Sequence, residues 1–248
     1  MTMELAGKTA VITGASRGLG AGLARDFARR GMRLGLCATS APVLPDGPDV
    51  VAAELDVRDA GAVEGFCRAV AERLGPIDLW INNAGVLEPI GPLVDAPVAE
   101  WSRHIEINVL GVAWGSAAFC RHRRAVGPGG TLVNVSSGAG RRGYFGWSAY
   151  CAGKAAVDRM SECLALEEKA AGTRILAVAP GIVETRMQEQ IRASSADDFP
   201  EVERFRRIKE DDRFSSPEWV AARLLELVFD PERASGEVLV GLPLEHAV

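Results

Sequence analysis

The sequence lacks the features of metal-binding, disulfide-stabilised and membrane-spanning proteins. Its five cysteines are scattered and include no Cys-x-x-Cys pair, which argues against a disulfide framework or a zinc site. The three histidines form no metal-ligand spacing. No apolar run reaches the roughly 20 residues that a membrane span requires. The cysteines are therefore expected to be reduced thiols that fill small apolar spaces.

An excess of positive charge is also absent. The net charge is −5, so neither nucleic acid nor an anionic membrane surface is an expected partner. The first residues, MTMELAGKTAVITG, lack the apolar core and cleavage site of a signal peptide, which predicts a cytoplasmic protein. The chain has no internal repeat, low-complexity stretch or domain break. Residues 1–248 are therefore expected to form one domain.

Short apolar runs alternate with helical patterns along the chain. Strands are expected at 8–13, 33–38, 51–57, 129–137, 173–181 and 235–242, and a strand with its following turn at 77–85. Helices are expected at 21–31, 59–74, 99–125, 148–171 and 217–229. The segment 186–213 reads mostly as a solvated helical face, whose apolar residues can close over a ligand: Met187, Ile191, Phe199, Phe205 and Ile208. This order predicts an α/β fold, a single-domain doubly wound parallel sheet of the Rossmann type with helices on both faces.

A glycine-rich turn follows the first expected strand. Gly14, Gly18 and Gly20 lie between strand and helix, where glycine permits a tight turn and close approach of a ligand. The helix N-terminus then offers free amides and a positive dipole end to a pyrophosphate. The same turn is compatible with a plain strand–helix connection. Its place after the first strand favours dinucleotide binding.

The end of the second expected strand has no acidic residue. Dinucleotide folds that hold the ribose hydroxyls of NAD usually have an acid there, whereas this chain has Ala38, Thr39 and Ser40. The next acid is Asp46. Thr39 and Ser40 can donate hydrogen bonds to a 2′-phosphate, and Arg17 can pair with it, although Arg17 also fits an exposed loop cation. These residues favour NADP(H) over NAD(H).

A tyrosine and a lysine provide the candidate acid–base chemistry. Tyr150 and Lys154 are four residues apart, which on a helix places them on one face. An ammonium beside a phenol lowers the tyrosine pKa towards neutrality, and such a phenol can donate or accept a proton. Ser136 and Ser137 end the preceding strand, at the sheet edge where ligands bind. Cys151 adjoins Tyr150 and is interpreted as a packing residue, because no histidine lies near it in sequence.

In this order and spacing, the motifs resemble the short-chain dehydrogenase/reductase family over essentially the whole chain. They are Thr13-Gly14-x-x-x-Gly18-x-Gly20, Asn82-Asn83-Ala84-Gly85, Asn108, Ser137, Tyr150-x-x-x-Lys154 and Pro180-Gly181. The resemblance selects Ser137 over Ser136, because Ser137 lies at the family's usual separation from Tyr150. Ser136 is then expected to form a hydrogen bond at the strand end.

The resemblance implies a catalytic set of Asn108, Ser137, Tyr150 and Lys154. Tyr150 would donate the proton, and Ser137 would bind the same carbonyl oxygen. Lys154 would keep the Tyr150 pKa low and bind the nicotinamide ribose. Asn108 would order a water in a proton relay. A buried amide on an apolar helix face also fits a structural hydrogen bond to backbone, so both roles of Asn108 remain open.

The resemblance also implies an NADP(H) site. Asp56 would accept from the adenine amine, and Pro180, Gly181 and Thr185 would hold the nicotinamide carboxamide. Thr185 also fits a helix N-cap. The full implied cofactor set is Gly14, Ser16, Arg17, Gly18, Leu19, Gly20, Thr39, Ser40, Asp56, Val57, Asn83, Ala84, Gly85, Tyr150, Lys154, Pro180, Gly181, Val183 and Thr185.

A narrower resemblance concerns the substrate. The stretches SSGAGRRGYFGWSAYCAGKAA, APGIVETRMQEQIR and FRRIKEDDRFSSPEWVA resemble the benzil reductase and sepiapterin reductase branch. That branch implies reduction of an α-dicarbonyl or α-hydroxyketone, and the aromatic residues before Tyr150 suggest an aromatic one. They also fit packing between strand and helix. The expected substrate contacts are Leu87, Gly138, Tyr144, Trp147 and Met187.

The expected partner is a small-molecule carbonyl substrate. The family commonly forms dimers or tetramers. The final residues GLPLEHAV lack the Asp-Gly-Gly pattern frequent in tetrameric relatives, which favours a homodimer with a tetramer as the alternative. Two other functions were weighed. An NAD-dependent alcohol dehydrogenase is disfavoured by the missing acid, and a non-catalytic dinucleotide-binding sensor would not need Ser137, Tyr150 and Lys154.

Overall fold

The computed structural model describes residues 4–45, 49–230 and 236–246. The strands are β1 (Thr9–Thr13), β2 (Arg33–Ala38), β3 (Val50–Glu54), β4 (Leu79–Asn82), β5 (Thr131–Val135), β6 (Arg174–Ala179) and β7 (Leu239–Gly241). The α-helices are α1 (Gly18–Arg29), α2 (Ala60–Leu74), α3 (Val98–Ile105), α4 (Gly111–Val126), α5 (Ser148–Glu167), α6 (Arg186–Ala193), α7 (Val202–Glu210) and α8 (Pro217–Phe229). No helix in these ranges is both long and apolar enough to cross a membrane.

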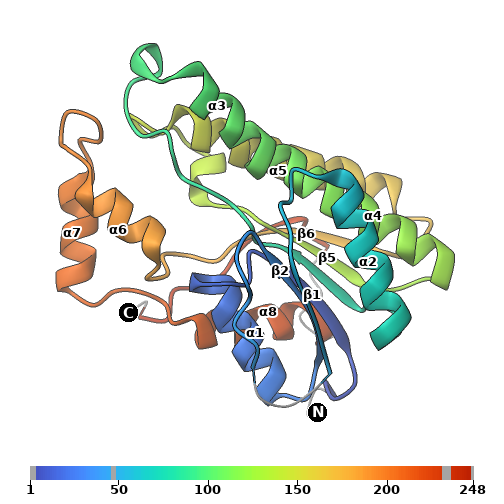
Figure 1. Cartoon of the computed structure of the whole chain (residues 1–248). Coiled ribbons are helices and arrows are strands. Elements are labelled where there is room, and N and C mark those ends of the chain that lie inside the picture. The colour runs from blue at the N-terminus through green and yellow to red at the C-terminus, as the bar shows by residue number, and fades with distance from the viewer. Residues whose placement is uncertain (1–3, 46–48, 231–235, 247–248) are drawn as a thin grey trace.

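The strands form one parallel sheet with helices on both faces (Figure 1), which confirms the predicted fold. The strand order is β3-β2-β1-β4-β5-β6-β7. The direction of winding changes between β1 and β4, where Val11 pairs with Trp80. In open parallel sheets a ligand crevice forms at this switch point, outside the carboxyl ends of the strands.

Alternating side chains of the sheet build two cores. Ala10 and Ile12 of β1 point to the face covered by α1 and α8. Val11, between them, points to the face covered by α2 and α4. Both faces are therefore buried, which explains why the strands read as continuous apolar runs.

Several predicted strands extend too far. The pattern predicted strands at 129–137 and 173–181, whereas β5 covers Thr131–Val135 and β6 covers Arg174–Ala179. The extra residues belong to the connections before and after each strand, where the hydrogen-bonding ladder does not extend. The last strand is β7 (Leu239–Gly241) rather than 235–242, and residue 235 lies outside the described residues, as does Asp46.

The helix predicted over 99–125 is interrupted. It begins as α3, passes through a π-helical turn at Glu106–Leu110, and continues as α4. Asn108 lies in the π-helical turn and is buried. A π-helical turn rotates the side chains that follow it and commonly occurs at functional sites.

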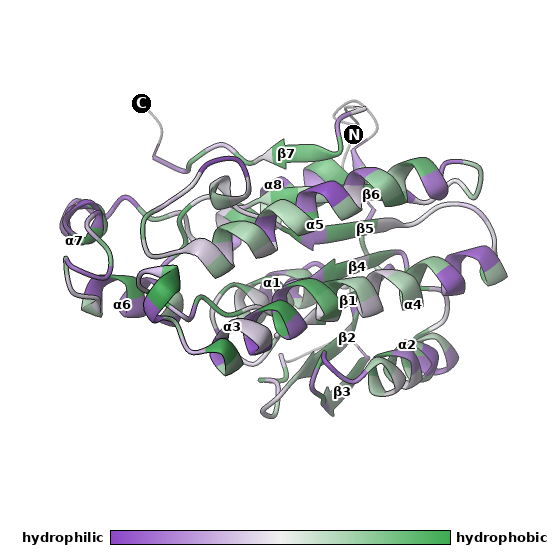
Figure 2. Ribbon diagram, turned by 90° about the horizontal axis from the view of Figure 1, so that it is seen from above, coloured by the Kyte–Doolittle hydropathy of each residue, from purple (hydrophilic) through white to green (hydrophobic). Residues whose placement is uncertain are grey.

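The segment after β6 combines a charged surface with a buried apolar side. Helices α6 and α7 lie to one side of the sheet (Figure 1), and Figure 2 shows many hydrophilic residues on α7. Ile191, Phe199, Val202 and Phe205 are nevertheless buried, because they pack in one cluster with Trp147. The segment has many charged residues, but its apolar residues recur at helical spacing and form one face.

A buried polar network joins the sheet to its helices. The amide of Asn82 at the end of β4 donates to Asn134 Oδ1 at 2.8 Å and to Ser116 Oγ on α4 at 3.1 Å. Its oxygen accepts from Trp80 Nε1 at 2.8 Å. Asn134 in turn donates to Ser161 Oγ on α5 at 2.9 Å. The network fixes both neighbouring strand ends relative to α4 and α5.

Replacement of Asn82 tests this network. Asn82→Ala leaves Trp80 Nε1 without its acceptor and Asn134 Oδ1 with only a long 3.4 Å hydrogen bond from Ser116 Oγ, so the free energy of unfolding should fall by about 2–3 kcal/mol. Urea denaturation measures the change. Arg121→Ala, which removes an exposed ion pair with Glu64, is the control and should change it by less than about 0.5 kcal/mol. Equal effects of the two variants would contradict a stabilising role for the network.

Candidate active site

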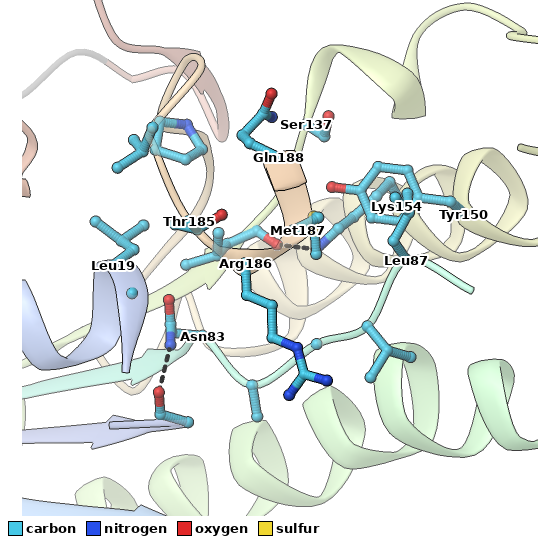
Figure 3. Close-up of a pocket in the computed structure, with 18 of the residues that line it drawn as sticks. Leu19, Asn83, Leu87, Ser137, Tyr150, Lys154, Thr185, Arg186, Met187 and Gln188 are labelled. Atoms are coloured by element: carbon cyan, nitrogen blue, oxygen red, sulfur yellow. Dashed lines mark hydrogen bonds between the residues drawn. The ribbon is translucent and has the colours of Figure 1, made fainter. Parts of the chain in front are cut away.

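A cavity of about 780 Å³ opens at the carboxyl edge of the sheet. Its walls come from the turns after β1 to β6 and from α5, α6 and α7. Figure 3 shows Tyr150 and Lys154 on one side, Leu19 and Asn83 on the other, and the start of α6 between them. One cavity therefore joins the glycine turn to the tyrosine–lysine pair.

The glycine turn has the backbone that a dinucleotide requires. Gly14 and Gly18 have φ values of 68° and 57°, in the left-handed region that favours glycine. A Cβ at Gly14 would lie 2.8 Å from Cα of Ala84. Arg17 is the N-cap of α1, and its side chain caps no backbone amide. The first amides of α1 thus remain available to an anion, and the residues fit a pyrophosphate.

Asparagine and threonine side chains hold this turn against β4. The Thr13 hydroxyl accepts from the backbone amides of Asn83 at 3.0 Å and Ala84 at 3.1 Å. The Asn83 amide donates to the carbonyls of Thr13 at 2.9 Å and Gly14 at 3.2 Å. The Asn83 side chain therefore ties the ends of β1 and β4 together across the switch point.

Most of the predicted cofactor residues line the cavity, and two do not. A Cβ at Gly20 would lie 2.5 Å from the Gly14 carbonyl oxygen, so this glycine allows α1 to pack on the turn without facing the cavity. Ser40 is exposed beyond the cavity wall. The remainder of the set lies in the wall: Gly14, Ser16, Arg17, Gly18, Leu19, Thr39, Asp56, Val57, Asn83, Ala84, Gly85, Tyr150, Lys154, Pro180, Gly181, Val183 and Thr185.

The end of the cavity near β2 and β3 is rich in arginine. Arg58 donates to Asp56 Oδ2 from Nε at 2.9 Å and from Nη2 at 2.6 Å, and the hydrogen bond to Arg58 lowers the pKa of Asp56. Arg17 and Arg103 line the same cavity. Sequence reasoning missed Arg58 and Arg103. The position of Arg58 two residues after Asp56 was the available signal.

Thr185 occupies the N-cap position of α6, and its hydroxyl makes no capping hydrogen bond. The prediction of an N-cap is therefore confirmed for the position of Thr185 and not for a capping hydrogen bond of its side chain. Its Cγ2 would lie 3.2 Å from a Cβ at Gly18, which places Thr185 directly beside the glycine turn. The side chain stays available to a ligand in the cavity.

Ser137, Tyr150 and Lys154 meet in the cavity wall. The Ser137 hydroxyl accepts from the Ala139 amide at 3.2 Å, which orients it at the end of β5. Tyr150 and Lys154 project from successive turns of α5, and both are buried. Lys154 Nζ donates to the Val135 carbonyl at 2.7 Å and lies 5.6 Å from the centre of the Tyr150 ring.

The protonation of this pair differs from the prediction. Burial raises the pKa of Tyr150 to about 12, and its hydrogen bond with Ser137 opposes that rise only in part. Burial also lowers the pKa of Lys154 to about 8, partly opposed by the charge of Asp158. The expected lowering of the Tyr150 pKa by Lys154 is therefore wrong for the chain alone. The loss of hydration outweighs the attraction between ammonium and phenolate.

Ser136 also lines the cavity, but its hydroxyl is bound to a buried carboxylate. Its hydroxyl donates to Asp158 Oδ1 at 2.5 Å. Both side chains are buried, and Asp158 lies one helical turn after Lys154. The prediction that Ser136 forms a hydrogen bond at the strand end is confirmed.

Asn108 lies behind the cavity wall rather than in it. Its Nδ2 donates to the Val86 carbonyl at 2.7 Å, and its Oδ1 accepts from the Val86 amide at 2.9 Å. The structural role is thus observed: the side chain joins the π-helical turn to the loop after β4. The water-ordering role remains a prediction.

His104 supports Asn108 and was missed by sequence reasoning. Its Nε2 lies 2.8 Å from Asn108 Nδ2, and its Nδ1 lies 2.7 Å from the Glu88 carbonyl. The Asn108 amide nitrogen can only donate a hydrogen bond, and the Glu88 carbonyl can only accept one. His104 Nδ1 therefore carries the proton, and Nε2 accepts. The ring meets Tyr150 edge-on at 6.1 Å. Its position one turn before Asn108 was the available signal.

Aromatic and aliphatic side chains form the end of the cavity beyond Tyr150. Trp147 stacks on Phe199 at 4.6 Å and contacts Tyr150 edge-on at 5.7 Å. Leu87, Gly138, Tyr144, Trp147 and Met187, the predicted substrate contacts, all line the cavity. Phe145 is exposed, and Cys151 packs in this cluster without lining the cavity. The packing interpretation of the aromatic stretch is confirmed for Trp147, which also lines the cavity, and contact with an aromatic substrate stays a prediction.

The buried histidine predicts a pH effect on stability. Burial lowers the pKa of His104 below its usual value near 6.5, so the folded state keeps it neutral where the unfolded state binds a proton. The stability that neutral His104 contributes is present above about pH 6.5, and it is lost as the pH falls towards the lower pKa of the folded state. In His104→Gln, which does not titrate, the melting temperature should fall less between about pH 7 and pH 5.5 than in the wild type.

His104→Leu serves as the control. It removes the same titration and also the acceptor for Asn108. Its free energy of unfolding should therefore fall by a further 1–2 kcal/mol or so, to the same extent at every pH. Identical pH dependence of the melting temperature in the wild type and in both variants would contradict a buried neutral His104.

Comparison with known proteins identifies the family. Residues 8–196 match the family model described as short chain dehydrogenase. A benzil reductase ((S)-benzoin forming) from Bacillus subtilis (strain 168) is 31% identical over 226 residues, covering 88% of this chain and 92% of that protein. Another, from Bacillus cereus, is 38% identical over 161 residues, covering 64% of this chain and 65% of that protein, so that match spans just under two thirds of it.

The fold comparison agrees. The crystal structure of a short-chain type dehydrogenase/reductase from Mycobacterium marinum superposes with a TM-score of 0.84 at 26% identity, covering 96% of this chain and 95% of that chain. Sequence motifs, sheet order and site geometry lead to the same result. The chain belongs to the short-chain dehydrogenase family of oxidoreductases, as its resemblance to the benzil reductase branch predicted.

Proposed function

We propose that this protein is an NADPH-dependent reductase of an aromatic ketone of the α-dicarbonyl or α-hydroxyketone type. The observation that carries the proposal is a single cavity in which Ser137, Tyr150 and Lys154 lie between the glycine turn and an aromatic pocket. The benzil reductases among the relatives act, by their names, on a ketone of this kind.

Different residues of the cavity bind the cofactor, bind the carbonyl oxygen and stabilise charge. The glycine turn and the amides of α1 hold the cofactor pyrophosphate, and Thr185 holds its nicotinamide end. When bound, the nicotinamide supplies the hydride that reduces the carbonyl carbon. Ser137 and Tyr150 donate hydrogen bonds to the carbonyl oxygen and stabilise the charge that develops there. Lys154, as an ammonium, adds positive charge beside the phenol.

The protonation of Tyr150 supports its role as the proton donor. Because burial raises its pKa to about 12, the phenol carries its proton at neutral pH. It can therefore donate to a forming alkoxide, which is a stronger base than a phenolate.

The arginine-rich end of the cavity supports NADPH as the coenzyme. No carboxylate follows β2, where Ala38 and Thr39 line the wall. Asp56, the carboxylate nearest in sequence among the lining residues, is paired with Arg58. Arg17 can therefore meet a 2′-phosphate without a competing anion beside it.

Removal of the phenol hydroxyl tests the proton donor. Tyr150→Phe should lower kcat for methyl phenyl diketone by at least about 100-fold, because proton transfer to the alkoxide is lost. The dissociation constant for NADPH should change less than twofold or so, since the ring remains. NADPH absorbance and fluorescence measure the two quantities. Tyr144→Phe is the matched comparison, since Tyr144 bonds Arg142, and it should lose less than about tenfold. Substantial turnover by Tyr150→Phe would disprove the assignment.

Removal of the Arg17 charge tests the coenzyme. Arg17→Gln should weaken NADPH binding about tenfold and leave NADH binding nearly unchanged, because only NADPH has the 2′-phosphate. Calorimetric titration measures both. Arg25→Gln, on the exposed side of α1 and outside the cavity wall, should change neither. Tighter binding of NADH than of NADPH by the wild type would reject the NADPH assignment.

A further inference from the structure

The side-chain amide oxygen of a buried glutamine in the cavity wall lacks a hydrogen-bond partner among the described residues. Gln188 of α6 lines the cavity, and only 8% of the residue is exposed. Its Oε1 is shielded from solvent and has no hydrogen-bond partner among the described residues. Buried polar groups in folded proteins are almost always paired, so an exception in a ligand cavity calls for an explanation.

The other amides in the described part of the wall are paired. Asn83 donates to the carbonyls of Thr13 and Gly14. Gln190, two residues after Gln188 on the same helix, donates to Glu88 Oε1. The unpaired amide of Gln188 is thus an exception to the pattern of its own cavity.

Gln188 lies at the substrate end of the cavity. The spacing on α6 places Met187, Gln188 and Ile191 on one side of the helix. Met187 and Ile191 pack in the same cluster as Trp147 and Tyr150. The close-up agrees, since it shows Gln188 at the start of α6 with Tyr150 in the same pocket (Figure 3). A substrate that fills the aromatic end of the cavity therefore lies beside Gln188.

We propose that Gln188 binds a second oxygen of the substrate, adjacent to the carbonyl that Ser137 and Tyr150 hold. This inference rests on the proposed function and adds the residue that selects the substrate class. An amide offers a donor and an acceptor, so it can pair with either a neighbouring carbonyl or a neighbouring hydroxyl. A ketone without that oxygen leaves the amide unpaired. The free energy of the transition state for its reduction is therefore higher.

The test compares two activated ketones of similar size. Methyl phenyl diketone has the second oxygen, whereas phenyl trifluoromethyl ketone has none. Gln188→Met keeps the length of the side chain and removes its hydrogen bonds. Its ratio of kcat/KM for the diketone over the trifluoromethyl ketone should fall about tenfold relative to the wild type. NADPH consumption measures both rates.

Gln190→Met is the matched control, because it removes the paired amide of the same helix and should keep the ratio within about twofold of the wild type. Gln188→Asn gives a second measurement if the methionine variant unfolds. Its shortened amide should lower the ratio in the same direction.

Equal loss of both activities, or an equal fall of the ratio in Gln190→Met, would overturn the role of Gln188 and leave the proposed function standing. A wild type that reduces neither ketone would instead overturn the proposed function, and this inference with it.

Discussion

The proposed chemistry depends on a lysine that is held almost without water. Lys154 is 7% exposed, and its ammonium donates to the carbonyl of Val135 at the end of β5. Burial lowers the pKa of Lys154 to about 8 and raises that of Tyr150 to about 12. The helix that carries both must therefore lie tightly against the strand end, and much of the fold serves that contact.

The polar networks explain how the contact is maintained. Asn82 and Asn134 join β4 and β5 to α4 and α5, and Ser136 joins the end of β5 to Asp158 of α5. His104 and Asn108 join the π-helical turn to the loop after β4. Each network is buried and ends at a strand terminus. Together they place rigid elements around a cavity whose inner surface stays open to ligands.

Much of the site was predictable because its motifs are local. The glycine turn, the Tyr150–Lys154 spacing and the serine at the end of β5 each need only a few neighbouring residues, and the parallel order of strands brings them to one edge. The same logic failed at Gly20 and Ser40, which lie beside cavity residues in sequence but face elsewhere. Whether a residue faces the cavity depends on how the turn packs, which its position next to cavity residues in the sequence does not reveal.

The sequence by itself determined the fold class, the family and the catalytic spacing, since periodicity and short motifs are encoded within single elements. The tertiary structure alone decided the protonation of Tyr150, because its pKa follows from burial by distant segments. It also revealed the π-helical turn with its His104 support, and the unpaired amide of Gln188. These features arise where separate elements meet, and hydration and hydrogen-bond pairing there cannot be read from any one stretch of chain.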